Sequence, residues 1–374
     1  PTSLGSTTAG SFAAYLTGGS LGLSNDANMR AAFVYTPIVP TTPRPSQTST
    51  VIFDPLPRTD IGDELVDAGV HRLVIIYQGV DMQSVESGII DADVGVAAIR
   101  SQYGDSPSGF GMLDFETPFF QRIEAGPESP LYQQTVDTIV AALQRLRAEF
   151  PDVRWTMYGM PLLRYWVAPT GYPWSAAPEA DCEAQRQRTL ANYDPVMREC
   201  DWLSPSSYDR YELASFTPDR WEQITAQEVA WRENQSEICR RFNESSGLPA
   251  KPIIPMISTM FWSVGQMEYN MKQMPLEEML RDQVIPLMAG GADGIAIWTG
   301  LSYWVRSATS AADLGPTQVE ARYALTQDFL DGVEPSDWTD PTVKAFLEEV
   351  TSLHVRQRIE EVKAHLETAS PDSG

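Results

Sequence analysis

Short apolar runs alternate along the chain with stretches whose apolar residues recur at helical spacing. Runs of this length, bounded by turn-forming residues, are typical of buried strands. The pattern predicts strands at Ala32–Tyr35, Arg72–Tyr77, Phe110–Phe115, Arg154–Tyr158, Trp202–Ser206, Pro252–Ile257 and Gly294–Trp298, with a further short one at Val51–Phe53. Because strands that alternate with helices are usually joined by crossover connections, this order indicates a parallel sheet.

Two helices between these strands have the clearest signals. The first begins at Ser129-Pro130, an N-cap followed by proline at the first helical position. Its apolar positions are Val136, Ile139, Val140, Leu143 and Leu146. The second ends at Gly290-Gly291, a common helix stop. Its apolar positions are Leu276, Met279, Leu280, Ile285 and Leu287.

The succession of strands and helices predicts an α/β fold, specifically a TIM-type (β/α) barrel of seven or eight parallel strands, with a C-terminal helical extension. We expect a weakly ordered N-terminal arm over residues 1–30, which are rich in Gly, Ser, Thr and Ala, and the barrel over residues 31–312. The extension, residues 313–374, would contain a helix at Pro316–Val333 and an amphipathic helix opened by Asp340-Pro341. This last helix would pack on the barrel or, alternatively, serve with the arm in oligomerisation or docking.

Two long connections follow predicted strands, at residues 159–200 and 209–250. Long connections at that end of a barrel often build the binding face, so we expect loops there.

The net charge of −23 and the pI near 4.4 change the picture of possible partners. Such a surface repels nucleic acid and anionic membranes, so we expect no nucleic-acid partner. No apolar run reaches the ~20 residues that a membrane span needs.

Histidine and cysteine are scarce, which narrows the chemistry. The three histidines are His71, His354 and His365, so a Ser-His-Asp triad or a histidine-based metal site is not expected. No glycine-rich phosphate loop is present, and we expect neither a metal nor a cofactor. Cys182 and Cys200 would form a disulfide in a secreted protein or remain free thiols, and the sequence leaves both open.

One predicted strand, Phe110–Phe115, ends in two carboxylates, Asp114 within it and Glu116 directly after it. Side chains alternate between the faces of a strand, so these two acids share one face. A buried pair of acids is costly unless it is paired or working, and glycosidic bonds are cleaved by carboxyl groups in divided roles. The alternative is structural, with Asp114 capping the next helix and Glu116 paired with Arg164 or Arg210.

Aromatic residues end three other predicted strands, namely Tyr158, Tyr208 and Trp298. Aromatic residues at strand ends often serve packing, but sugar rings stack on aromatic faces. The predicted loops add Tyr165, Trp166, Tyr172, Trp174, Tyr211, Phe261, Trp262, Tyr303 and Trp304. Such a density fits a carbohydrate groove, although it also suits a protein interface. The candidates for substrate contact are Trp298, Tyr77, Trp166, Trp262 and Trp304.

In this order and spacing, four segments resemble motifs of the hyaluronidase family of glycoside hydrolases. They are Leu113-Asp114-Phe115-Glu116, Trp155-Thr156-Met157-Tyr158-Gly159-Met160-Pro161, Pro205-Ser206-Ser207-Tyr208 and Gly291-Ala292-Asp293-Gly294-Ile295-Ala296-Ile297-Trp298. The resemblance covers roughly residues 70 to 300. It implies a barrel enzyme, outside or on the surface of the cell, that cuts a polysaccharide.

The resemblance also implies roles for five residues. Glu116 would be the general acid, and the substrate's own N-acetyl carbonyl would replace an enzyme nucleophile. Asp114 would stabilise that acetamido group, Tyr158 and Tyr208 would orient it, and Trp298 would pack against it.

The sequence departs from the family after Glu116, where it reads Thr117-Pro118-Phe119-Phe120, and the family's disulfide pattern is not evident. The acidity of the chain favours an N-acetylhexosamine glycan other than the polyanion hyaluronan. A chitinase-like or muramidase-like hydrolase is an alternative. The alternative from another class is a barrel that binds glycan without cutting it, or a structural surface or virion component.

Overall fold

A computed structural model of the chain describes residues 50–53, 70–78, 87–208, 217–258, 279–298 and 359–364. The strands are β1 (Thr50–Phe53), β2 (His71–Tyr77), β3 (Gly109–Asp114), β4 (Val153–Met157), β5 (Trp166–Val167), β6 (Tyr172–Pro173), β7 (Met256–Ser258) and β8 (Gly294–Trp298). The helices are α4 (Ala92–Tyr103), α5 (Phe119–Glu124), α6 (Tyr132–Glu149), α7 (Glu179–Glu199), α8 (Pro218–Ser245), the π-helical turn η4 (Leu280–Val284) and α10 (Ile285–Ala289). The arm, the strand at Ala32–Tyr35 and the helix at Pro316–Val333 lie outside these residues.

The fold is α/β, built on a parallel sheet of six strands in the order β4-β3-β2-β1-β8-β7. β2 and β3 run in register from Leu73↔Phe110 to Tyr77↔Asp114. Because all six strands are parallel, their carboxyl ends lie at one edge. The tips of β2, β3, β4 and β8 therefore bring Tyr77, Asp114, Met157 and Trp298 to the same edge.

The segment 201–207 lies between the two outer strands of this sheet. The Asp201 N–H donates to the carbonyl of Trp155 in β4 at 2.7 Å, and the Leu203 N–H donates to the Pro252 carbonyl at 2.8 Å. Its bridges to the β7 side, at Leu203↔Ile253 and Ser206↔Met256, are parallel but isolated. The regular strand predicted at Trp202–Ser206 is thus reduced to bridges, because prolines in this segment and its neighbour cannot donate to a ladder.

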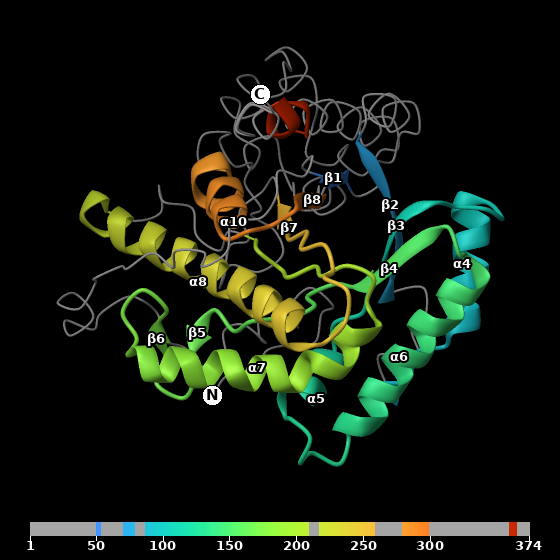
Figure 1. The fold of residues 1–374 in the computed structure, drawn as a ribbon, viewed down its shortest axis with the longest axis horizontal. Coiled ribbons are helices and arrows are strands. Elements are labelled where there is room, and N and C mark those ends of the chain that lie inside the picture. Colours follow the sequence, from blue (N-terminus) through green and yellow to red (C-terminus); the bar gives the residue numbers. More distant parts are fainter. Residues whose placement is uncertain are drawn as a thin grey trace, which may run out of the picture.

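The core covers both faces of the sheet. Every residue from Phe110 to Leu113 in β3 is buried, as is each residue from Gly294 to Ile297 in β8. Strands buried on both faces are typical of parallel sheets wrapped by helices. In Figure 1 α4 lies beside α6, and α7 beside α8, and each consecutive pair from α4 through α6 and α7 to α8 is in contact.

The predicted helices form, with shifted starts. α6 begins at Tyr132 rather than at Pro130, because the Ser129 carbonyl accepts the Tyr132 N–H in a turn that leads into the helix. The second predicted helix appears as η4 followed by α10, and it ends at Gly290 as expected. Its Ile285, however, is 48% exposed rather than buried.

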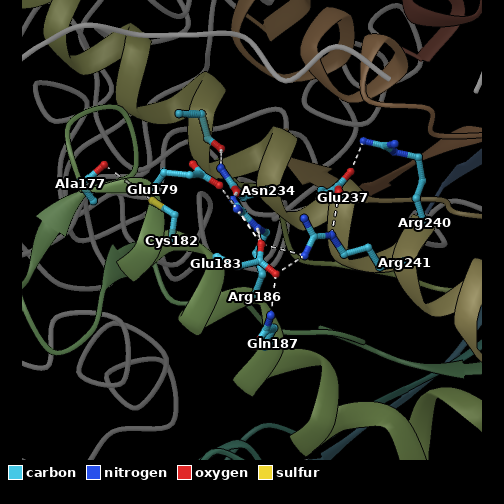
Figure 2. A network of polar contacts seen from close by, with 11 residues as sticks. Ala177, Glu179, Cys182, Glu183, Arg186, Gln187, Asn234, Glu237, Arg240 and Arg241 are labelled. Atoms are coloured by element: carbon cyan, nitrogen blue, oxygen red, sulfur yellow. Dashed lines mark hydrogen bonds and ion pairs between the residues drawn. The ribbon is translucent and has the colours of Figure 1, made fainter. Parts of the chain in front are cut away.

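Long helices replace the loops expected at residues 159–200 and 209–250. α7 and α8 fill most of these connections, and a polar network joins them (Figure 2). Arg186 of α7 is buried, donates to the Asn234 amide oxygen of α8 at 2.6 Å and pairs with Glu183 at 2.9 Å. Arg241 of α8 reaches back to Glu183 at 2.7 Å. The expectation of loops was wrong because the buried faces of these helices carry polar side chains, which hides their apolar period.

Part of the C-terminal region packs on the sheet. Residues 359–364 are helical, and Ile359 and Val362 are fully buried in one cluster with Ile257, Ile295 and Ile297. These described residues therefore belong to the core beside β7 and β8.

Candidate active site

Asp114 and Glu116 lie where β3 ends, beside the ends of its two neighbouring strands. Asp114 is paired in register with Tyr77 of β2. On the other side the Tyr158 N–H donates to the Leu113 carbonyl at 2.8 Å. Leu113 and Phe115 are buried in the core, and the charges of Asp114 and Glu116 both act on Tyr158, so the two carboxyl groups lie near the same phenol.

Burial perturbs both carboxyl groups in the same direction. It raises the pKa of Asp114 from its ordinary 3.8 to about 7. Burial, and then the charge of Asp114, raises the pKa of Glu116 well above its ordinary value. The structure therefore favours a pair that keeps a proton on Glu116 while Asp114 ionises first.

Neither acid is neutralised by an ion pair with Arg164. The guanidinium of Arg164 pairs instead with Glu124, at 2.6 Å. Among the residues that the structure describes, Glu116 Oε2 is buried and has no hydrogen-bond partner. The second cation considered for this role, Arg210, lies outside those residues. The pair is thus desolvated without the compensation that a structural ion pair would bring.

Tyr158, Tyr208 and Trp298 form a continuous aromatic stack. The rings of Tyr158 and Tyr208 have centroids 5.9 Å apart at 28°, and those of Tyr208 and Trp298 are 5.4 Å apart at 24°. Burial and the charge of Glu116 raise the pKa of Tyr158 well above its ordinary value. Burial, Tyr158 and Asp114 do the same for the pKa of Tyr208. Both phenols therefore remain protonated and are able to donate hydrogen bonds.

Of the other candidates for substrate contact, one lies at the edge that carries the acids, and the rest lie elsewhere or outside the described residues. Tyr77 is 38% exposed at the tip of β2. Trp166, in β5, packs edge-on against Tyr165 in a separate cluster on α7 and α8. Trp262 and Trp304 fall outside the residues that the structure describes.

Two of the aromatic residues assigned to a binding groove are part of the core instead. Tyr165 is 1% exposed and its hydroxyl donates to Glu228, while Trp174 is 5% exposed and donates to the Arg164 carbonyl. Sequence could not separate them from surface aromatics, because their partners, Glu228 of α8 and the Arg164 carbonyl, lie in connections expected to be loops.

Two site residues escaped the sequence analysis. The hydroxyls of Tyr158 and Ser206 lie 2.6 Å apart in a hydrogen bond. Gln78, the residue after β2, accepts the Glu116 N–H at 3.1 Å. The only signal in the sequence was position. Ser206 ends one predicted strand and Gln78 follows another, at the edge that carries the acids.

A buried ion pair supports the backbone next to Tyr208. Arg232 of α8 has a fully buried side chain and pairs with Glu228 at 3.1 Å. Its Nε donates to the Ser207 carbonyl at 3.1 Å and its Nη1 to the Asp282 carbonyl at 2.6 Å. The segment that carries Tyr208 is therefore tied to α8 and η4.

Within the described ranges, no three His, Cys, Asp or Glu side chains are grouped closely enough to hold a metal ion. No helix among those ranges is long and apolar enough to cross a membrane. All three cysteines lie in described segments and are buried free thiols, so the disulfide alternative for Cys182 and Cys200 does not hold.

No protein-family model matches this chain, and no curated protein matches it in sequence. Among solved structures, the chain is similar to the monoclinic crystal form of bee venom hyaluronidase, at 14% identity over 73% of this chain and 97% of that chain, with a TM-score of 0.48. It is similar to bee venom hyaluronidase in complex with a hyaluronic acid tetramer at 12% identity, over 79% and 100% of the two chains, with a TM-score of 0.44. It is also similar to a GH18 chitinase from Pseudoalteromonas aurantia at 15% identity, over 63% and 72%, with a TM-score of 0.33. Because these likenesses are distant, the chemistry of this chain rests on its own side chains.

Proposed function

We propose that this protein is a glycoside hydrolase that cleaves a polysaccharide containing N-acetylhexosamine, by a retaining, substrate-assisted mechanism. One observation carries the proposal. Two half-buried carboxyl groups, Asp114 at the end of β3 and Glu116 two residues beyond it, lie without a cationic partner among the described residues, beside a stack of aromatic rings. Removing such a pair from water without a partner costs free energy of folding. A catalytic role accounts for that cost, whereas a role in packing does not.

Glu116 is the general acid. A carboxyl group whose pKa is raised well above its ordinary value holds its proton to higher pH than an ordinary glutamate does, as a general acid requires. The proton moves to the glycosidic oxygen as the bond between that oxygen and the anomeric carbon breaks. The resulting carboxylate then takes a proton from the water that attacks in the second step.

The placement of both acids at one end of β3 supports substrate assistance. Asp114 is the last residue of that strand and Glu116 follows two residues later, and the charges of both act on Tyr158, so the two acids would approach a sugar from one side. An enzyme nucleophile paired with a general acid would have to flank the bond. The acetamido carbonyl oxygen of the substrate fills that role instead by bonding to the anomeric carbon. Asp114, ionised, accepts the acetamido N–H and stabilises the positive charge that develops there.

The aromatic stack suits recognition of that acetamido group. The neutral phenols of Tyr158 and Tyr208 are donors to its carbonyl oxygen as it attacks, which holds the oxygen in line with the anomeric carbon. Trp298, half-buried at the end of the stack, offers its face to the sugar or the acetamido methyl group.

We propose further that the sheet closes into a TIM-type barrel. The support is the segment 201–207, whose backbone hydrogen bonds reach β4 on one side and the chain leading into β7 on the other. Closure of this kind would place the carboxyl ends of all the strands around one mouth, where the acids and the stack lie.

The test is reducing-end release from a panel of hyaluronan, chondroitin, chitin oligomers and peptidoglycan. Glu116→Gln keeps the shape of the side chain but cannot donate the proton, so we expect its rate to fall by ~100-fold or more. Glu128→Gln makes the same change at an exposed glutamate and should act like the wild type. If wild type cuts nothing, or Glu116→Gln cuts equally well, the protein is instead a glycan-binding or structural barrel.

A further inference from the structure

The side-chain amide of Gln78 forms hydrogen bonds with backbone groups on both sides of the peptide bond between Glu116, the candidate acid, and Thr117. Gln78 comes directly after β2, and its Oε1 accepts the Glu116 N–H at 3.1 Å. Its Nε2 donates to the Thr117 carbonyl. One side chain, placed just after a neighbouring strand, thus bonds with its acceptor to the Glu116 N–H and with a donor to the Thr117 carbonyl.

Glu116 needs this support because it lies beyond the sheet ladder. The last registered pair of β2 and β3 is Tyr77↔Asp114, two residues before it. The Glu116 carbonyl accepts the Phe120 N–H at 2.9 Å, which joins it to the start of α5. Its N–H is held by Gln78. The backbone of Glu116 is therefore fixed on both sides, while its carboxyl Oε2 is buried without a hydrogen-bond partner in the described part of the chain.

We propose that Gln78 is a positioning residue, which holds the backbone of Glu116 so that the carboxyl group points at the glycosidic oxygen. The role rests on the proposed function, since it presupposes that Glu116 is the acid. A primary amide suits the position because it supplies both an acceptor and a donor, whereas a carboxylate supplies only acceptors. Catalysis tolerates little displacement of the acid, so loosening this contact slows the chemical step more than it weakens substrate binding.

The experiment compares Gln78→Met, Gln78→Glu and a matched control. Gln78→Met keeps the length of the side chain and loses both hydrogen bonds, so kcat should fall by ~10-fold or more while KM stays within about 2-fold. Gln78→Glu keeps the acceptor for the Glu116 N–H and adds a negative charge. That charge should move the alkaline limb of the pH profile to higher pH. Gln121→Met removes a 3.2 Å bond to the Thr117 hydroxyl from an exposed side chain and should leave kcat unchanged.

A second readout needs no activity. Hydrogen exchange at the Glu116 amide should be ~10-fold or more faster in Gln78→Met than in wild type, and unchanged in Gln121→Met. Equal exchange in Gln78→Met and wild type would overturn the proposal, as would an unchanged kcat in an active enzyme. If wild type cuts no glycan, the proposed function fails by itself, and exchange at Glu116 alone decides whether Gln78 holds that backbone.

Discussion

The hydroxyl of Tyr158, at the end of β4, lies 2.6 Å from the hydroxyl of Ser206, which is 48 residues away along the chain. Both residues are buried, and Ser206 belongs to the segment that leads to Tyr208. The contact fixes the orientation of the Tyr158 phenol. Burial is the largest cause that raises the pKa of this phenol, and the charges of Glu116 and Asp114 raise it further.

Replacing Tyr158 with phenylalanine should slow catalysis without unfolding the protein. The substitution keeps the stacked ring but removes the hydroxyl that would donate to the acetamido oxygen. Because the acceptor is a carbonyl oxygen and not an anion, this hydrogen bond is worth about 0.5–1.5 kcal/mol, and we expect kcat to fall by about 2- to 10-fold. Steady-state kinetics with the cleaved polymer measures this. Ser206→Ala, which leaves the phenol in place, should cost less, and an equal loss in both variants would assign the effect to packing.

The pH dependence of kcat/KM should be bell-shaped, with its acidic limb set by Asp114 and its alkaline limb by Glu116. The reaction needs Asp114 ionised and Glu116 protonated. Burial raises the pKa of Asp114 to about 7, so activity rises as the pH rises through that value. Activity then falls when the pH passes the pKa of Glu116, which burial and the Asp114 charge raise well above its ordinary value. Initial rates over a broad pH range test this. An acidic limb near pH 4 would show that Asp114 is not desolvated in solution.

Asp114→Asn should stabilise the folded protein at neutral pH while it impairs catalysis. The folded state raises the pKa of Asp114 from 3.8 to about 7, so it binds that proton more tightly than the unfolded chain does. The stability that this tighter proton binding gives the folded state is fully present below about pH 3.8 and is lost as the pH rises through about 7. Asparagine never ionises, so the variant gains on wild type as the pH rises, by at most about 4 kcal/mol. Urea unfolding at several pH values measures the gain.

Its control is Asp105→Asn, since the Asp105 side chain is 91% exposed. We expect its difference from wild type to stay small and to change little with pH. A gain for Asp114→Asn that is the same at pH 3 and pH 8 would contradict the assigned cause.

The sequence predicted the sheet where its strands are continuous apolar runs. Gly294–Trp298 is a strand with the predicted bounds, and the predicted Phe110–Phe115 differs from β3 by a residue at each end. Such runs are buried on both faces of a parallel sheet, so their composition alone identifies them. The acids and the aromatic stack were found for the same reason, since each ends such a run.

The sequence did not predict α7, α8 or the support around the site. Gln185, Arg186 and Asn192 lie on the buried face of α7, where an apolar period would otherwise mark a helix. A polar residue becomes a core residue only when a partner on another element satisfies it, and local sequence does not show that partner. Gln78 was missed for this reason, because its partners are backbone atoms nearly forty residues away.

Removing the buried guanidinium of Arg232 should destabilise the fold strongly. Arg232→Met leaves Glu228 buried without its cation and frees the carbonyls of Ser207 and Asp282. Breaking a buried ion pair in this way costs about 3–5 kcal/mol. Arg198→Met removes a 2.6 Å pair with Asp194 from a side chain that is 43% exposed, and it should cost less than about 1 kcal/mol. Chemical denaturation compares the two. Similar losses would mean that Arg232 is hydrated in solution.

Gly111 should not tolerate even a methyl group. It lies opposite Trp155 in the β3–β4 register, and a Cβ there would come within 2.5 Å of the Trp155 ring and 2.6 Å of the Val153 side chain. Both neighbours are buried, so Gly111→Ala should cost about 1–3 kcal/mol in the free energy of unfolding.

Gly95→Ala is the matched change in α4, where the nearest atom is the Ile76 Cδ1 at 3.2 Å. That methyl group lies at the end of a flexible side chain, and alanine favours the helix by roughly 0.5–1 kcal/mol, so stability should stay within about 1 kcal/mol of wild type. Thermal unfolding of the pair tests the packing. If Gly111→Ala were as stable as Gly95→Ala, β3 and β4 would lie farther apart than the Trp155 contact requires.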